Sequence, residues 1–179
     1  YEGKEYLGFF DHGDGDVNQC KDCHSVHGLE VQTEACAECH EEIEDGATVQ
    51  DIRYTLTDFD GDGDETEGLY YEIDTMLTDL YAAIQAYAAD TLGTPIAYDA
   101  NSYPYFFMDS NGNGVVDPEE AVRENGFSGW TPRLLRGAYN YQWASKDPGS
   151  FAHNGQYIIQ TLYDSIEDMG GDVSAMTRP

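Results

Sequence analysis

Basic residues are scarce in this chain. Lysine and arginine together number 8, against 35 aspartates and glutamates among 179 residues, so the formal net charge is -27 at pH 7. Such a surface repels phosphates, which excludes nucleic acid and anionic lipid as partners. Long apolar runs are also absent, since a membrane-spanning helix needs about 18 consecutive apolar residues. No catalytic triad and no phosphate-binding loop is present, which argues against hydrolytic chemistry.

Cysteines are few, and all four belong to two copies of the motif C-x-x-C-H. The motif residues are Cys20, Cys23 and His24, then Cys36, Cys39 and His40. Two thiols three positions apart can add to the two vinyl groups of one haem, and the following histidine can reach the iron. The sequence therefore predicts two covalently bound haem c groups. The alternatives are zinc, which C-x-x-C pairs also hold, and disulfides, which would leave both histidines unexplained.

Residues 1–50 carry almost no periodic apolar pattern and are dominated by Gly, Asp and Cys. Such a segment cannot bury enough side chain to fold alone. Because a porphyrin face is a large apolar plate, we expect the haems to form the core of this segment. The prediction is a haem-wrapped run of loops and short turns.

The spacing of histidines around the two motifs resembles that of a known family. An upstream His12, a C-H-x-x-H-G step that includes His27, and a second C-x-x-C-H together cover residues 9–41. This arrangement is similar to the doubled module of multihaem c-type cytochromes. The resemblance implies that His12 and His27 are distal iron ligands.

The chain has five histidines, so three remain for two distal positions: His12, His27 and His153. His153 lies in an Ala-His-Asn step at the start of an expected helix, and multihaem cytochromes often place a distal ligand in such a step. Two imidazoles on each iron leave no open position for substrate and suit electron transfer. One histidine is surplus unless it ligates a haem of another copy, so His12 or His153 could join copies as in extracellular cytochrome filaments.

Residues 58–69 resemble a calcium loop of the EF-hand type. The oxygen-bearing candidates are Asp58, Asp60, Asp62, Asp64 and Glu67. Gly63 stands at position 6, where the loop turns sharply. Leu69 occupies position 12 in place of the usual glutamate, so Glu67 or Glu72 would substitute. The alternative is an acidic linker.

Residues 109–120 match the same pattern at every diagnostic position. The candidate ligands are Asp109, Asn111, Asn113, the carbonyl of Val115, Asp117 and Glu120. Gly114 again stands at position 6. We expect one to two structural calcium ions, on a frame that departs from an EF-hand because Pro104 interrupts the preceding segment.

Three helices are expected from apolar residues at spacings of three and four, over residues 68–92, 131–145 and 150–169. Thr131 followed by Pro132 is a favourable helix start. An aromatic-rich loop or short strand is expected at 94–108. The run from residue 131 to 154 also resembles the C-terminal helical hairpin of large multihaem cytochromes.

Together these features predict a mainly α fold with much irregular coil. We expect a dihaem-binding segment at 1–50 and a helical domain at 51–179. The helical domain would hold the calcium loops 58–69 and 109–120 and the helical hairpin 131–169.

The predicted function is an extracytoplasmic dihaem c-type cytochrome that carries electrons. Its partners would be other cytochromes, copies of itself in a homopolymer, and an extracellular electron acceptor. Covalent haem attachment occurs outside the cytoplasm, and the chain begins at Tyr1 without a signal peptide, so we interpret it as a mature extracellular or periplasmic protein. The alternatives are a haem reductase with one open iron and a calcium-dependent structural module.

Overall fold

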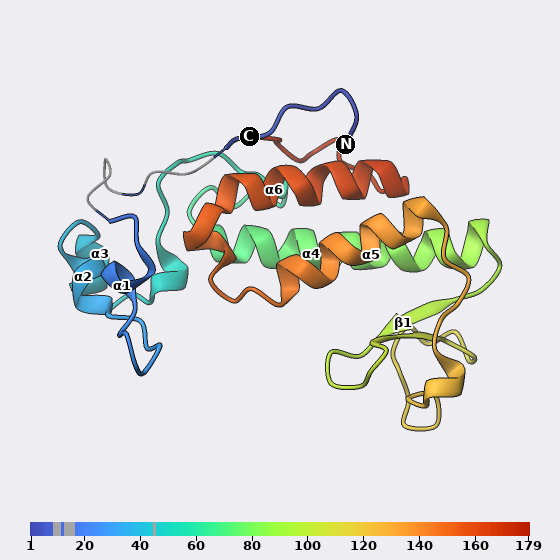
Figure 1. Cartoon of the computed structure of the whole chain (residues 1–179). Helices are drawn as coiled ribbons and strands as arrows, with labels where there is room; N and C mark the ends of the chain where they lie inside the picture. Colours follow the sequence, from blue (N-terminus) through green and yellow to red (C-terminus); the bar gives the residue numbers. More distant parts are fainter. Residues whose placement is uncertain (9–11, 13–16, 45) are drawn as a thin grey trace. The chain divides into compact units, whose positions relative to one another are not determined.

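The computed structural model describes residues 1–8, 12, 17–44 and 46–179 (Figure 1). The structure is 45% helical with one two-stranded sheet and much coil, which confirms the mainly α prediction. The chain forms two compact units. The first comprises Tyr1–Thr75, Pro148–Gln160 and Ala175–Pro179, and the second comprises Met76–Asp147 and Thr161–Ser174. Neither unit ends at residue 50. The expected segment 1–50 was defined by haem binding, and it stays a prediction.

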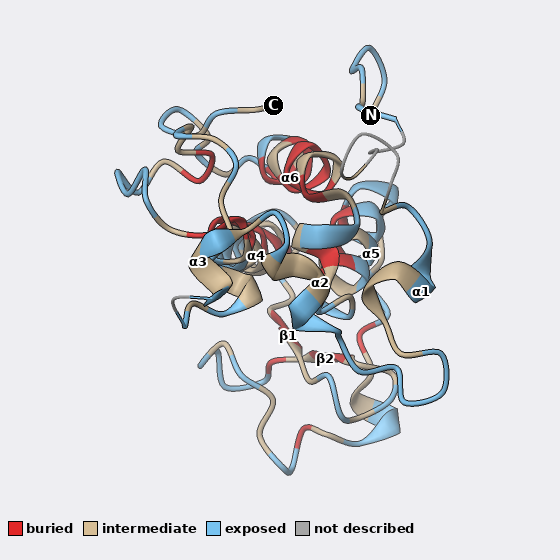
Figure 2. Ribbon diagram, turned by 90° about the vertical axis from the view of Figure 1, so that its left-hand side faces the viewer, coloured by how far each residue is buried: buried red, intermediate tan, exposed pale blue. Residues whose placement is uncertain are grey.

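The N-terminal part of the first unit consists of very short helical elements. They are α1 (Cys20–Cys23), α2 (Thr33–Ala37), α3 (Glu41–Glu44) and the 3₁₀ turn η2 (Val49–Asp51). None of these elements has a buried residue, and Figure 2 shows the buried residues on the longer helices instead. Loops and short turns were expected here, and they are confirmed.

The core of the first unit lies where the starts of α4 (Leu69–Ala86) and α6 (Ser150–Met169) meet. Gly155 approaches Leu69 so closely that an added Cβ would overlap its side chain. The rings of Tyr70 and Phe151 lie edge to face with centroids 5.8 Å apart. Both chain ends are tied to this region, because Gln160 accepts a hydrogen bond from the N–H of Leu7 at 2.8 Å and donates one to the carbonyl of Pro179 at 2.7 Å.

Helix α6 is interrupted at Asn154, whose backbone is extended (φ -166°, ψ 68°). The Asn154 side chain accepts a hydrogen bond from the N–H of Tyr157 at 3.4 Å, as an N-cap does for the helix that follows. Its amide donates to the carbonyl of Gly8 at 2.9 Å. The helix expected at 150–169 is confirmed in extent, but the break places His153 at the end of a separate first turn.

The second unit is built on the remainder of α4, which continues into the π-turn η3 (Tyr87–Thr91), on α5 (Pro132–Ser145) and on the remainder of α6. Its fully buried side chains include Met76, Leu80, Ile84, Leu134, Leu162 and Ile166. A Cβ on Gly137 would lie 3.0 Å from the sulfur of Met169 and 3.7 Å from Ile84, so α5 packs closely on both other helices. Thr131 caps α5 by accepting from the N–H of Leu134 at 3.2 Å, as expected.

A small β-hairpin completes the second unit. Strand β1 (Ile96–Tyr98) pairs antiparallel with β2 (Phe106–Met108), in the register Ile96 with Met108. The loop 109–120 follows β2 directly, and the next element is the 3₁₀ turn η4 (Arg123–Asn125). This loop therefore has no α-helix adjoining it on either side in the described chain, and the expected departure from an EF-hand frame is confirmed.

Candidate functional site

The two C-x-x-C-H motifs adopt the same local backbone arrangement. In each, the histidine N–H donates to the carbonyl of the first cysteine, from His24 to Cys20 at 2.8 Å and from His40 to Cys36 at 2.9 Å. This turn brings cysteines at helical spacing i and i+3 to one side of the backbone. Both motifs thus offer two thiols on one side with a histidine immediately after them.

The four cysteines are unpaired thiols. Burial raises the pKa of Cys23, and the charges of Asp22 and Cys20 raise it further. Burial also raises the pKa of Cys36, with a contribution from Cys23. Reactive dithiols and zinc-binding thiolates need the opposite shift. Among the described residues the groups of three or more metal-ligating side chains contain only carboxylates, so the zinc alternative finds no support in the geometry.

The ring nitrogen Nδ1 of each motif histidine faces an oxygen. Nδ1 of His24 lies 3.2 Å from the carbonyl of Leu29, and Nδ1 of His40 lies 3.4 Å from Oε1 of Glu42. A proton on Nδ1 that is directed to these oxygens leaves Nε2 as the free metal ligand. Leu29 adopts the left-handed conformation (φ 57°), which costs a non-glycine residue roughly 1 kcal/mol.

Four of the five imidazoles form two facing pairs, one edge to face with an interplanar angle of 73° and one tilted at 51°. The ring centroids of His12 and His40 are 6.2 Å apart, and those of His24 and His153 are 6.5 Å apart. One iron bonded to two imidazoles at about 2 Å each separates the two ring centres by about 6 Å. The two pairs therefore match the donor set of two bis-histidine haem c groups.

His27 belongs to neither pair. It is exposed at the tip of a turn, which is closed by hydrogen bonds between Ser25 and Glu30 at 2.8 Å and between Leu29 and Ser25 at 3.0 Å. The family resemblance implied His12 and His27 as distal ligands, whereas the rings that lie beside His40 and His24 are those of His12 and His153. Which of the three ligates iron stays a prediction. The stretches 9–11 and 13–16, which flank His12 in the family resemblance, lie outside the described residues.

The ring of His153 is positioned by the backbone beside it. A Cβ on Gly149 would lie 2.8 Å from Cε1 of His153, so only a glycine lets the backbone approach this face of the ring. The N–H of His153 donates to the carbonyl of Gly149 at 2.9 Å. Asn154 then ends the turn, so His153 faces His24 instead of continuing along the helix.

The two acidic loops share one hydrogen-bond scheme. The carboxylate of Asp58 accepts from backbone N–H groups three and five residues later, at 2.6 and 2.9 Å. The carboxylate of Asp109 accepts at the same two positions, at 2.7 and 2.8 Å. All four donors are glycines with positive φ: Gly61, Gly63, Gly112 and Gly114. The first loop thus folds as the second does, despite its different position 12.

Glu72 takes the place of the missing glutamate in the first loop. Glu120 accepts from the N–H of the second loop residue, Ser110, at 2.6 Å, and Glu72 accepts from the equivalent N–H of Phe59 at 2.8 Å. Glu72 is fully buried on α4 and pairs with Arg53 at 2.7 Å. In the sequence, Glu72 is recognisable as a glutamate that stands among the apolar positions of the helix expected at 68–92.

The predicted ligands of the first loop divide into two groups. Asp58, Asp60 and Glu72 have carboxylate oxygens within 4.8 Å of one another, and so do Asp60, Asp62 and Glu67. Asp64 lies outside both groups, because its carboxylate accepts from the N–H and hydroxyl of Thr66.

Burial and neighbouring charges raise the pKa of two of these carboxyl groups. Burial, opposed by the hydrogen bond from the N–H of Asp62 and helped by the charge of Glu72, raises the pKa of Asp60 to about 6. Burial, followed by the charges of Asp60 and Asp62, raises the pKa of Glu67 to about 7.

The second loop is satisfied by its own groups. The amides of Asn111 and Asn113 donate to Oδ2 of Asp117 at 2.6 and 2.9 Å. The carboxylate of Glu120 accepts from Ser110 and, at 3.3 Å, from Asp117. No oxygen of this loop is buried without a partner. Calcium binding at residues 109–120, including the carbonyl of Val115, stays a prediction.

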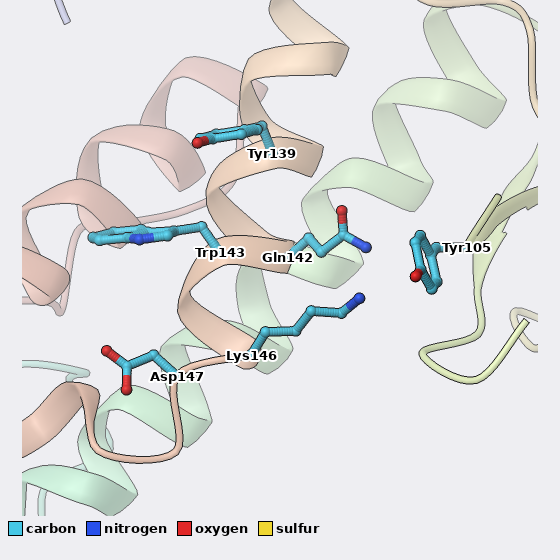
Figure 3. Close-up of a pocket in the computed structure, with 6 residues that line it drawn as sticks. All are labelled: Tyr105, Tyr139, Gln142, Trp143, Lys146 and Asp147. Carbon is cyan, nitrogen blue, oxygen red and sulfur yellow. The ribbon is translucent and has the colours of Figure 1, made fainter. Parts of the chain in front are cut away.

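A shallow hollow of about 390 Å³ lies in the second unit, beside α5 (Figure 3). Its lining residues are Tyr105, Tyr139, Gln142, Trp143, Lys146 and Asp147. The ammonium of Lys146 lies 3.7 Å from the centre of the Tyr105 ring. This lining has no histidine or cysteine, and it forms a mixed aromatic and charged surface without a catalytic arrangement.

No helix among the described residues is long and apolar enough to cross a bilayer. The chain matches no family model and no solved structure. It is 34% identical over 94 residues to the C-type polyheme cytochrome OmcB in two strains of Geobacter sulfurreducens, and equally to OmcC of that organism. The match covers 48% of this chain but only 12% of each relative. About half of this chain is therefore similar to a short segment of polyheme c-type cytochromes.

Proposed function

We propose that this chain is a dihaem c-type cytochrome module that carries electrons outside the cytoplasm. The two facing histidine pairs carry the proposal. The haem ligands are assigned as Cys20, Cys23, His24 and His153 for one haem, and as Cys36, Cys39, His40 and His12 for the other. When bound, each haem supplies a one-electron redox couple.

The arrangement of the ligands favours electron transfer over catalysis. His24 and His40 present Nε2 because their Nδ1 atoms face oxygens of Leu29 and Glu42. The rings of His153 and His12 would supply the second imidazole of each site when haem is bound. With both axial positions taken by imidazole, no position is open for a substrate such as nitrite or peroxide, which disfavours the reductase alternative.

Exposed apolar side chains in the N-terminal segment support a haem-wrapped core. Val26 is 70% exposed, Leu29 76% and Val31 47%, while the short helices there have no buried residue. Covering such side chains with a porphyrin face stabilises the segment by about 25 cal/mol for each Å² of apolar surface removed from water. Covalent attachment of haem takes place outside the cytoplasm, which supports an extracellular or periplasmic location.

The test is a low-temperature electron paramagnetic resonance spectrum of the oxidised protein, with haem counted per chain. Native protein should hold two haems and give two low-spin signals. His153→Ala should convert one haem to high spin, whereas the matched variant His27→Ala should leave both low-spin. A high-spin signal in the native protein would instead favour the reductase, and high spin in the His27 variant alone would overturn the pairing.

Assembly into a homopolymer is the second part of the proposal. In a homopolymer, His12 or His153 would ligate a haem of the next copy in place of its own, so that every iron would keep two imidazoles. A coordinate bond of this kind would oppose the mutual repulsion of chains that carry a net charge of -27. Negative-stain images should show filaments of the native protein and of His27→Ala, but only monomers of the variant that lacks the bridging histidine, His12→Ala or His153→Ala, whereas monomers in the native sample would refute assembly. Monomers would then pass electrons to other cytochromes or to an extracellular acceptor.

A further inference from the structure

One carboxylate oxygen in the first acidic loop is buried without any donor. Asp60 is only 5% exposed. Its Oδ1 accepts from the N–H of Asp62 at 3.1 Å, but its Oδ2 is buried and has no hydrogen-bond partner. A buried carboxylate oxygen without a donor or a cation is strongly unfavourable. The position of Asp60 therefore favours either a proton on its carboxyl group or a cation beside it.

The Asp60 carboxyl group has one side-chain donor, the hydroxyl of Thr75, and its other near neighbours are further acceptors. Asp60 belongs to both groups of carboxylates whose oxygens lie within 4.8 Å of one another, with Asp58 and Glu72 on one side and with Asp62 and Glu67 on the other. Oε1 of Glu67 is also buried without a partner. Two unsatisfied oxygens thus lie within one cluster of five carboxylates.

Among the described residues, the positively charged side chain that pairs with this cluster is Arg53, and it pairs with Glu72. Arg53 is 9% exposed, and its guanidinium pairs with Oε1 of Glu72 at 2.7 Å. The same guanidinium donates to the backbone carbonyls of Glu67 and Thr57. Oε2 of Glu72 accepts from the N–H groups of Phe59 at 2.8 Å and Asp60 at 2.9 Å. Arg53 therefore fixes Glu72 in place but leaves Asp60 and the Glu67 carboxylate without a positive partner.

We propose that the cluster of Asp58, Asp60, Asp62, Glu67 and Glu72 is a binding site for a hard divalent cation of the calcium class. The donor atoms are all oxygens, which select hard cations over zinc or copper. Calcium accepts six to eight oxygens in flexible geometry, whereas magnesium demands a near-ideal octahedron and retains water. A site that offers five carboxylates, four from the loop and one from α4, suits calcium.

The ligand set differs from the one that the loop pattern gives. The twelfth position holds Leu69, and the closing carboxylate comes from Glu72, one turn into α4. The site thereby joins the loop to the helix, with Arg53 as a positioning residue behind Glu72. This proposal is independent of haem binding, because none of its residues is a proposed haem ligand.

The test is the number of calcium ions bound per chain of the haem-loaded protein. Calcium is measured by equilibrium dialysis against calcium chloride, and chains are counted by amino-acid analysis. Asp60→Asn should bind one ion fewer per chain than the native protein. The matched control is Glu65→Gln, which removes the same charge from an exposed position of the same loop and should bind as many ions as the native protein. An equal count in native and Asp60→Asn protein would overturn the site.

Thermal unfolding provides a second readout that a purely structural role of Asp60 would not produce. In calcium-free buffer, Asp60→Asn should melt at the same temperature as the native protein or higher, because an unpaired buried charge is gone. In calcium, only the native protein and Glu65→Gln should be stabilised. If Asp60→Asn fails to fold, Glu67→Gln tests the same cluster with the same expectations. Stabilisation of both cluster variants by calcium to the native extent would refute the proposal.

Discussion

The two proposed haems differ in what lies behind their first histidine, and this difference predicts unequal reduction potentials. His24 faces a neutral carbonyl oxygen of Leu29, whereas His40 faces the carboxylate of Glu42 at 3.4 Å. A carboxylate behind a ligand histidine raises its basicity and stabilises the more positive metal state. The haem ligated by His40 should therefore have the lower potential. Glu42→Gln removes the charge but keeps an oxygen that can still accept from Nδ1.

The size of the effect follows from the geometry of the contact. Loss of an outer carboxylate typically changes ligand–metal equilibria at least tenfold, and a tenfold change in a one-electron equilibrium is about 59 mV. Glu42 is 43% exposed and its contact is long, so water screens part of its charge. We expect Glu42→Gln to raise one midpoint potential by roughly 30 mV, about half of the tenfold value, and to leave the other unchanged.

Spectroelectrochemical titration resolves the two midpoints. Glu44→Gln is the matched control, because it removes the same charge from an exposed position of the same short helix α3. An equal rise in both variants would mean that general charge, and not the His40–Glu42 contact, sets the potential. Equal rises at both haems in Glu42→Gln would also refute the reasoning.

Two further substitutions test the supports of these sites. Gly149→Ala places a Cβ 2.8 Å from the ring of His153, so it should convert part of one haem to high spin. The control Gly8→Ala adds a Cβ that meets nothing within 4 Å and should leave both haems low-spin. Identical resonance spectra of the two variants would contradict this prediction. Arg53→Gln leaves the fully buried Glu72 without its ion pair. This should lower the free energy of unfolding by about 3–5 kcal/mol and the melting temperature by roughly 10 °C. Thermal unfolding in calcium-free buffer measures this loss, and a shift under about 3 °C would refute it.

The sequence predicted the features that depend on local spacing. The helices followed from apolar residues three and four positions apart, because one helical face must meet the core. The start of α5 followed from Thr131, whose side chain caps the helix in the structure. The C-x-x-C-H and acidic loop positions were equally readable, because ligand chemistry fixes their spacing within a dozen residues.

The distal histidines could not be ranked in this way, because their partners depend on tertiary structure. His27 stands three residues after His24, yet the turn between Ser25 and Glu30 directs it to solvent. His153 is distant in sequence, and it meets His24 only because α6 breaks at Asn154. No local sequence pattern predicts the tertiary packing that brings the start of α6 to the N-terminal segment.

The first unit places its apolar core beside the acidic loop and not beside the proposed haem ligands. Phe59, between two of the clustered aspartates, is buried, and its carbonyl accepts from the N–H of Thr177 at 3.0 Å. Leu69 and Ile73, which flank Glu72 on α4, are buried as well. Because these apolar contacts surround a cluster of like charges, the charge must be neutralised before the core reaches its full stability. The sequence of this unit is too acidic and too poor in apolar residues to fold on side-chain packing alone. A cation in the loop and haem in the N-terminal segment would therefore each stabilise its fold.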